Sequence, residues 1–201
     1  MIVALCLASR GLTHSRTMEA ALWNLRLAEV DFIPCFSHDE PIPDAQNLVT
    51  IQALSTNAEW LWYLEEDVIP PSTALRAMLP EARVVTAKYR NRGGTWAFSQ
   101  DRCGRLQYAG MGCLLVHRSV FSKLKVPYFD VTSNWTWQDD GTVKASPIES
   151  GAYGRQDIHF FAQLWQSGIE ARLANIICEH AQVKKYGEPN TNKGCHEIET
   201  I

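Results

Sequence analysis

Apolar residues gather in short continuous runs in the first third of the chain. The runs cover residues 2–8, 32–36 and 60–64, and each ends at polar or turn-forming residues. Runs of this length are typical of strands that are buried on both faces of a sheet. The segments between them, residues 17–30 and 45–56, have the length and apolar spacing of helices. This alternation predicts a doubly wound α/β fold.

The pattern becomes shorter and less regular after residue 71. Ser72 is a suitable N-cap for a short helix. Residues 126–152 show no hydrophobic period and are rich in turn-forming residues, which indicates a long loop. The expected elements of this half are helical segments at residues 72–79, 119–123 and 155–167 and strands at residues 84–89, 95–99, 105–108, 113–116 and 169–177.

The composition is that of a globular protein with one domain. The chain has 201 residues, of which 46% are hydrophobic and 20% charged, and no apolar segment has the length of a membrane span. The amino terminus lacks the basic region of a signal peptide. Six scattered cysteines without a CxxC pair indicate reduced thiols. We therefore expect a cytoplasmic protein.

Charge is unevenly distributed along the chain. The formal net charge of -3 does not favour a protein that binds polyanions with its whole surface. Between Arg83 and Lys125, however, nine Lys or Arg residues stand against one acidic residue, Asp101. Arg90 and Arg92 lie in this segment, and the aromatic residues Tyr89, Trp96 and Phe98 are interleaved with its cations as in a surface that contacts nucleic acid. The segment predicts either a surface that contacts nucleic acid or an ordinary solvated surface.

Three carboxylates follow the third apolar run. Glu65, Glu66 and Asp67 end the run, and Pro70 and Pro71 come shortly afterwards. Ligands bind at the carboxyl ends of the strands in open α/β sheets. Three adjacent negative charges repel one another unless a cation or ligand compensates them. The triplet therefore predicts a binding site, and a solvated acidic turn that opens a helix is the alternative.

Four short motifs occur in a fixed order along the chain. They are Trp60–Pro71, Gly110–Val116, Gly154–Phe160 and Cys178–His180. In this order they resemble the GT-A glycosyltransferases, in particular the small stand-alone members of the family 2-like group that many phages and bacteria encode. The resemblance covers nearly the whole chain.

The resemblance implies a fold and a separate function for each of two segments of the chain. The expected fold is a single GT-A domain, a Rossmann-like mixed sheet flanked by helices. Residues 1–71 are expected to form the half that binds the nucleotide sugar. Residues 72–201 are expected to form the half that binds the acceptor and carries the catalytic group.

The resemblance also implies a divalent metal, Mn²⁺ or Mg²⁺. In this family an Asp-x-Asp motif holds the metal against the donor diphosphate, and the matching residues here are Glu65, Glu66 and Asp67. Asp67 keeps the oxygen ligand that a hard cation prefers, whereas Glu65 is expected to meet the ribose hydroxyls. His180 matches a histidine that completes the metal shell in many of these enzymes.

Two other interpretations of His180 stay open. It is either a histidine without a ligand role or part of a zinc site. The zinc site would need a set of residues that matches no standard zinc spacing: Cys178, His180, Cys195 and His196.

Asp157 is the candidate general base. It matches the aspartate of a Glu-Asp pair that, in inverting members of the family, takes the proton of the acceptor hydroxyl. Gln156 stands where the glutamate is usual. The alternative is a first-turn Asp that only stabilises the helix dipole.

The remaining site residues are expected around the donor and the acceptor. A UDP donor is expected at the end of the first strand, and the residues expected to bind it are Ala8, Ser9, Arg10, Asn47, Glu65, Glu66 and Lys184. The residues expected to bind the acceptor are Gly112, Trp135, Trp137, Arg90 and Arg92. The two Trp side chains could instead pack into the core.

The acceptor is open at this stage. Similar small phage enzymes glycosylate hydroxymethylated pyrimidines in DNA, so the resemblance makes DNA a candidate acceptor alongside a saccharide or a protein. A nucleotidyltransferase and a catalytically inactive nucleotide- or sugar-binding module are the rival functions. The expected activity is an inverting, metal-dependent sugar transfer from a nucleotide donor.

Overall fold

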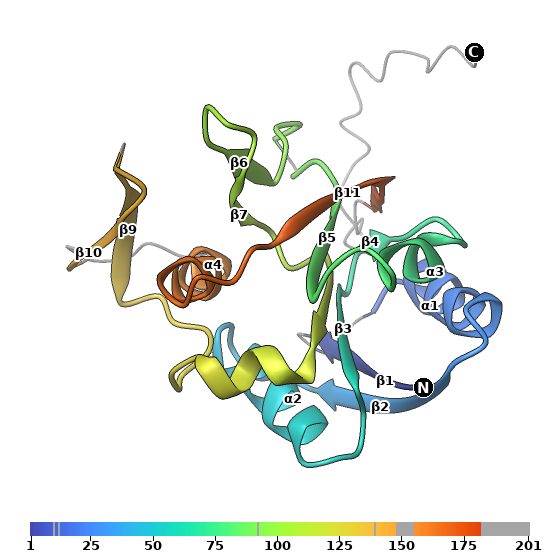
Figure 1. Cartoon of the computed structure of the whole chain (residues 1–201). Helices are drawn as coiled ribbons and strands as arrows, with labels where there is room; N and C mark the ends of the chain where they lie inside the picture. The colour runs from blue at the N-terminus through green and yellow to red at the C-terminus, as the bar shows by residue number, and fades with distance from the viewer. Residues whose placement is uncertain (10, 12, 92, 139, 148–154, 182–201) are drawn as a thin grey trace, which may run out of the picture.

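The computed structural model describes the chain except for residues 10, 12, 92, 139, 148–154 and 182–201. A six-stranded sheet with the order β11-β5-β8-β3-β1-β2 lies at its centre (Figure 1). The strand β8 runs antiparallel to both of its neighbours, and the other five strands run parallel to one another. The strands are β1 (Ile2–Ala8), β2 (Asp31–Ser37), β3 (Trp60–Glu65), β5 (Val84–Lys88), β8 (Cys113–His117) and β11 (Arg172–Ile177).

Helices cover both faces of this sheet, which explains its continuous apolar runs. Side chains of β3 alternate between two cores: Leu61 and Tyr63 lie in one core, and Trp62 and Leu64 lie in the other. The first core includes residues of α2 (Asp44–Leu54) and α4 (Gln156–Gln166). The second includes residues of α1 (Ser15–Leu27) and α3 (Ala74–Met78). Figure 1 shows these two helix layers on either side of the sheet.

Among the described residues, the short elements form three two-stranded ribbons and one 3-10 helix. The ribbons are β4 (Val68–Ile69) with β12 (Glu179–His180), β6 (Phe98–Gln100) with β7 (Leu106–Ala109), and β9 (Ser133–Trp137) with β10 (Val143–Pro147). A 3-10 helix spans Arg118–Lys123. Within the described residues, none of the helices combines the length and the apolar character that crossing a membrane requires.

The sheet confirms the expected mixed α/β fold flanked by helices. Two details of the expectation are wrong. The long loop predicted at residues 126–152 contains the β9–β10 hairpin, whose side chains are nearly all at least partly exposed, so no alternating hydrophobic pattern marks it. The helix α3 begins at Ala74 with Thr73 at its N-cap, and Ser72 does not cap it.

The order of the strands creates a switch point between β1 and β3. From β1 the chain passes to β2 on one side, and β3 then pairs with β1 on the other side. In open α/β sheets, ligands bind outside the carboxyl ends of the strands at such a point. The fold therefore directs attention to the residues that follow Ala8 and Leu64.

Candidate active site

The carboxyl ends of β1 and β3 lie side by side, since Ala8 pairs with Glu65 in the parallel register. The hydroxyl of Ser9 donates a hydrogen bond of 3.2 Å to Oε2 of Glu66. The backbone oxygen of Glu66 accepts a hydrogen bond of 2.8 Å from the backbone N–H of His14. These contacts attach the loop after β1 to the acidic triplet. Arg10, expected to bind the donor, lies outside the described residues.

The β4–β12 ribbon brings together Asp67 and His180, which are far apart in the sequence. In this antiparallel pair, His180 lies opposite Val68, the residue after Asp67, and the backbone N–H of Ala181 donates a 2.7 Å hydrogen bond to the oxygen of Asp67. Nε2 of His180 is 3.2 Å from Oδ1 of Asp67. Only 15% of the His180 side chain and 6% of the Asp67 side chain are exposed. The two expected metal ligands thus form one pair.

The spacing of this pair fits two ligands of one divalent cation. Adjacent ligands of an octahedral ion with bonds of about 2.1 Å lie about 3 Å apart. Among the described residues, no group of three or more His, Cys, Asp or Glu side chains is arranged to hold a metal. Mg²⁺-like sites commonly use one or two protein ligands and leave the rest of the shell to phosphate and water. Asp67 and His180 are suited to that kind of site.

The alternative zinc site gains no support from Cys178. The buried Cys178 thiol has its pKa raised, first by a hydrogen bond with Cys113 and then by burial. A thiol must lose its proton to bind zinc, so this environment opposes a ligand role. Cys195 and His196 lie outside the described residues.

Tyr89 connects the acidic strand end to the histidine, and sequence reasoning assigned it instead to an exposed aromatic surface. Tyr89 directly follows β5, and its side chain is buried. Its hydroxyl accepts a 3.2 Å hydrogen bond from the backbone N–H of Gly112 and donates one of 3.4 Å to Oε2 of Glu65. Its ring lies edge-on to His180 at a centroid distance of 5.8 Å. Tyr89 therefore positions Glu65 and supports His180.

Gly112 is adapted to this tyrosine. A Cβ atom on Gly112 would lie 2.6 Å from Cζ of Tyr89, and one on Gly110 would collide with the same side chain. The two glycines therefore permit the close approach of Tyr89, which accounts for the Gly-Met-Gly motif without an acceptor. The expected contact of Gly112 with the acceptor stays a prediction.

Asp157 lies in the first turn of α4, where its Oδ1 accepts a 2.9 Å hydrogen bond from the N–H of Ile158. Burial raises the pKa of this carboxyl to about 7. The pKa of Tyr89 is raised by burial first and then by the charges of Glu65 and Asp157. The effect of both carboxyl groups on Tyr89 indicates that Asp157 and Glu65 lie in the electrostatic surroundings of this tyrosine. A carboxyl with a pKa near 7 is suited to general base catalysis at neutral pH.

Asn47 has a structural role that accounts for its side chain. Its Oδ1 accepts hydrogen bonds from the N–H groups of Tyr128 and Phe129 at 3.0 and 3.2 Å. Its Nδ2 donates to the carbonyl oxygens of Phe129 and Pro43 at 2.8 and 3.3 Å. The amide thus fastens the loop at residues 127–129 to α2, and its expected contact with the donor stays a prediction.

Among the described residues expected to bind the acceptor, Arg90 lines one depression, whereas Trp135 and Trp137 line another. Trp135 and Trp137 lie in β9. The Arg90 guanidinium donates a 2.7 Å hydrogen bond to the oxygen of Gly94 and lies 4.5 Å from the centroid of the Trp96 ring. Arg92 and the expected donor residue Lys184 lie outside the described residues.

Comparison with known proteins extends these findings. No protein family and no curated protein matches the sequence. The chain is similar in structure to a protein of STIV, with a TM-score of 0.61 and 14% identity over 90% of this chain and 85% of that one. It is also similar to the catalytic domain of Drosophila beta1,4galactosyltransferase 7, solved with xylobiose, with a TM-score of 0.56 and 12% identity over 97% and 76% of the two chains. At these identities the likeness concerns the fold. With its mixed sheet and the order of its motifs, the chain has the GT-A glycosyltransferase fold.

Proposed function

We propose that the protein is a metal-dependent glycosyltransferase that moves a sugar from a UDP donor to an acceptor hydroxyl with inversion. The observation that supports this most is the pairing of Asp67 with His180 beside the carboxyl ends of β1 and β3. These are the positions at which open α/β sheets bind ligands. A fold of this kind without such a pair would be compatible with many functions.

Each group at this edge has a part in donor binding. Asp67 and His180 are the residues that would hold Mn²⁺ or Mg²⁺, and an imidazole beside a carboxylate favours Mn²⁺ over a site of oxygen ligands alone. A bound cation would neutralise the negative charge of the leaving diphosphate. Glu65, to which the Tyr89 hydroxyl donates a hydrogen bond, would accept hydrogen bonds from the ribose hydroxyls.

Asp157 is the proposed base for the transfer. The acceptor oxygen attacks the anomeric carbon of the donor sugar from the side opposite the diphosphate. A bond forms between that carbon and the acceptor oxygen, and the bond to the diphosphate oxygen breaks with its electron pair. The carboxylate of Asp157 takes the hydroxyl proton. The pKa of about 7 leaves this group ionised in a substantial fraction of molecules at neutral pH.

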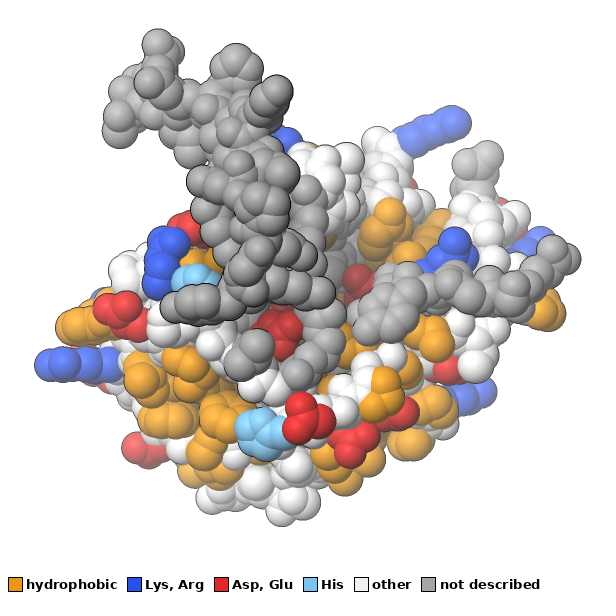
Figure 2. All heavy atoms as spheres, turned by 180° about the vertical axis from the view of Figure 1, so that it is seen from behind, with side chains coloured by type: hydrophobic (Ala, Val, Ile, Leu, Met, Phe, Trp, Pro, Cys, Tyr) orange, Lys and Arg blue, Asp and Glu red, His pale blue; other side chains and the backbone are white. Residues whose placement is uncertain are grey.

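A saccharide is the acceptor that we propose in place of a modified pyrimidine in DNA. The basic segment was the main argument for DNA, but several of its cations are engaged within the protein. Arg118 donates to the backbone oxygens of Leu54, Thr56 and Ala58, and Arg105 pairs with Asp101. On the face shown in Figure 2, Lys and Arg side chains are scattered, mostly toward the margins, and acidic side chains lie among them.

A panel of nucleotide sugars tests the proposal. Release of nucleoside diphosphate is measured with a mixture of saccharide acceptors, in Mn²⁺ and in EDTA. We expect at least one donor to be consumed, with a loss of at least about 100-fold in EDTA and in Asp67→Asn, because the metal acts on the leaving group. Asp44→Asn, an exposed carboxylate on α2, is the matched control and should keep full activity.

Two outcomes would replace the proposal by one of its rivals. Release of pyrophosphate from a nucleoside triphosphate, with no turnover of any nucleotide sugar, would indicate a nucleotidyltransferase. Binding of a nucleotide sugar without release of diphosphate under any condition would indicate an inactive binding module.

A further inference from the structure

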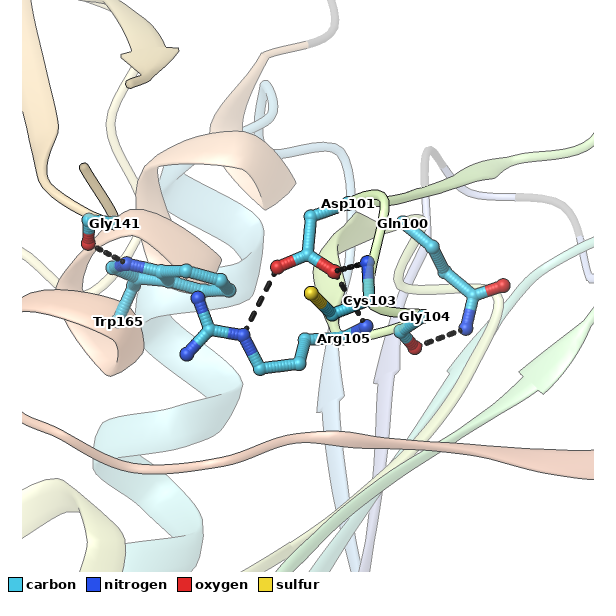
Figure 3. Close-up of polar contacts among 7 residues, drawn as sticks. All are labelled: Gln100, Asp101, Cys103, Gly104, Arg105, Gly141 and Trp165. Atoms are coloured by element: carbon cyan, nitrogen blue, oxygen red, sulfur yellow. Dashed lines mark hydrogen bonds and ion pairs between the residues drawn. The ribbon is translucent and has the colours of Figure 1, made fainter. Parts of the chain in front are cut away.

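A cavity lined by the β6–β7 and β9–β10 turns lies outside the Asp67–His180 pair. It has a volume of about 580 Å³, is open to solvent, and is also lined by Trp165 of α4. This volume is within the range of small-molecule sites. Figure 3 shows the turn at residues 100–105 facing Trp165 of α4 and Gly141 of the hairpin.

Polar contacts fix the three walls of this cavity to one another (Figure 3). Nε of Arg105 donates to Oδ2 of Asp101 at 3.0 Å, and the guanidinium lies 4.4 Å from the centroid of the Trp165 ring. The indole N–H of Trp165 donates a 2.7 Å hydrogen bond to the oxygen of Gly141. The cavity is therefore formed in advance of any ligand, which reduces the entropy lost on binding.

The charges that line the cavity cancel. Asp101 and Asp140 face Arg102 and Arg105 in the same lining. Hydrogen bonds from Arg105 and from Thr142 lower the pKa values of the two carboxyls, so both are ionised at neutral pH. Because a polyphosphate or nucleic acid needs an excess of cations, this lining favours an uncharged ligand.

The remaining groups suit a polyhydroxyl ligand. Three glutamine amides can both donate to and accept from hydroxyl groups, and the carboxylates accept from them. The Trp137 indole offers a flat apolar face against which the C–H face of a sugar ring can pack. At Trp165, the Arg105 guanidinium covers one face of the ring and adds hydrogen-bond donors for hydroxyl groups. The residues concerned are Gln100, Gln107, Gln138, Trp137 and Trp165.

A neighbouring depression continues the cavity toward the candidate base. It has a volume of about 400 Å³, shares Gln107 and Trp137 with the first cavity, and also includes Arg155 and Ile158. These last two residues flank the first turn of α4, which carries Asp157. Trp165 lies eight positions further along α4, about 12 Å at the helical rise. The two depressions therefore form one path along the helix, which we call the Trp137–Trp165 groove.

We propose that the Trp137–Trp165 groove binds a neutral oligosaccharide whose end lies near Asp157 and whose further units pack against Trp137 and contact the stacked Arg105 and Trp165 side chains. The inference rests on the proposed function, because the oligosaccharide bound here is the acceptor of the transfer. The groove selects for acceptors of several units, since a single sugar at Asp157 does not reach Trp165.

Direct binding tests this assignment without the donor. Cellotriose, maltotriose, chitotriose and xylotriose are titrated against the whole chain by calorimetry, and the indole N–H resonances are followed by NMR. We expect at least one of them to bind and to shift the Trp137 and Trp165 resonances. Trp137→Phe and Arg102→Ala should each weaken it at least about fivefold. Trp23→Phe, an exposed indole on α1, is the matched control and should not change binding. Thermal unfolding shows that each variant is folded.

The outcomes separate this inference from the proposed function. If no trisaccharide binds, if a neutral hexapeptide probe binds in their place, or if the groove variants bind as the wild type does, the assignment of the groove is wrong. The panel of nucleotide sugars decides the donor chemistry independently. Trisaccharide binding with the expected variant pattern, but no donor turnover, would leave a saccharide site in a protein that is not a transferase.

Discussion

The carboxyl group of Asp157 combines two properties that the sequence does not display together. Its place at the start of a helix could be predicted from the Gly154–Phe160 motif, but the burial that raises its pKa could not, because burial depends on the packing of the folded chain. Tyr89 shows the same limit. Its position in a basic segment predicts an exposed ring. Its contact with Glu65 depends on how it packs against Gly110 and Gly112, which the sequence does not show.

Asp157→Asn should abolish transfer and keep donor binding. Loss of a general base typically costs about 10²–10⁴ in rate, whereas the proposed donor contacts lie at β1, β3 and β4. For the wild type, kcat/KM should rise with pH up to about 7, because only the ionised carboxylate accepts the proton. A variant with near wild-type transfer would leave Asp157 the role of a helix-start carboxylate.

The same substitution should affect stability in a pH-dependent way. Burial raises the pKa of Asp157 from 3.8 to about 7, so ionisation costs the folded state stability as pH rises from about 4 through 7. Removing this cost should make Asp157→Asn more stable than the wild type at pH 8, on the order of 1–4 kcal/mol, and similar to it at pH 4. Urea unfolding at the two pH values measures the difference, and equal effects at both would contradict the raised pKa.

At the scale of elements, the continuous apolar runs predict where the strands lie, but they do not predict the exposed hairpin or the direction of each strand. The runs at β1, β2 and β3 were visible because helices bury both faces of the sheet. The β9–β10 hairpin could not be predicted, because its side chains are all at least partly exposed and therefore show no alternation of apolar and polar residues. The antiparallel direction of β8 likewise has no mark in its sequence, since a strand buried on both faces is apolar in either direction.

Asn47→Ala tests whether this residue fastens an element or binds the donor. Its amide serves four backbone groups, two of them N–H donors of the loop at residues 127–129. We expect a loss of about 1–3 kcal/mol in the free energy of unfolding with unchanged affinity for UDP. Asn57→Ala, an exposed turn residue, is the control. Unchanged stability with weakened UDP binding would instead support the donor-binding role.

At the scale of the whole molecule, the charge distribution does not favour a polyanionic acceptor such as DNA. The net charge is -3, and cations of the basic segment such as Arg105 and Arg118 serve internal contacts. The acceptor KM should therefore change little with salt. A DNA acceptor would instead release counterions, with a log–log slope of roughly -0.9 for each phosphate contact. A steep slope measured with a glycosylated acceptor would restore the nucleic-acid interpretation.

The central claim is that Asp67 and His180 bind a divalent metal, which in turn would bind the donor diphosphate at the ends of β1 and β3. Calorimetric titration of UDP with Mn²⁺ and with EDTA tests it most directly, in the wild type and in Asp67→Asn. We predict binding that weakens at least about tenfold in EDTA and in the variant, in which Mn²⁺ no longer increases the affinity. Equal affinity for UDP in Mn²⁺ and EDTA, or an Asp67→Asn variant that binds UDP as the wild type does, would contradict the account.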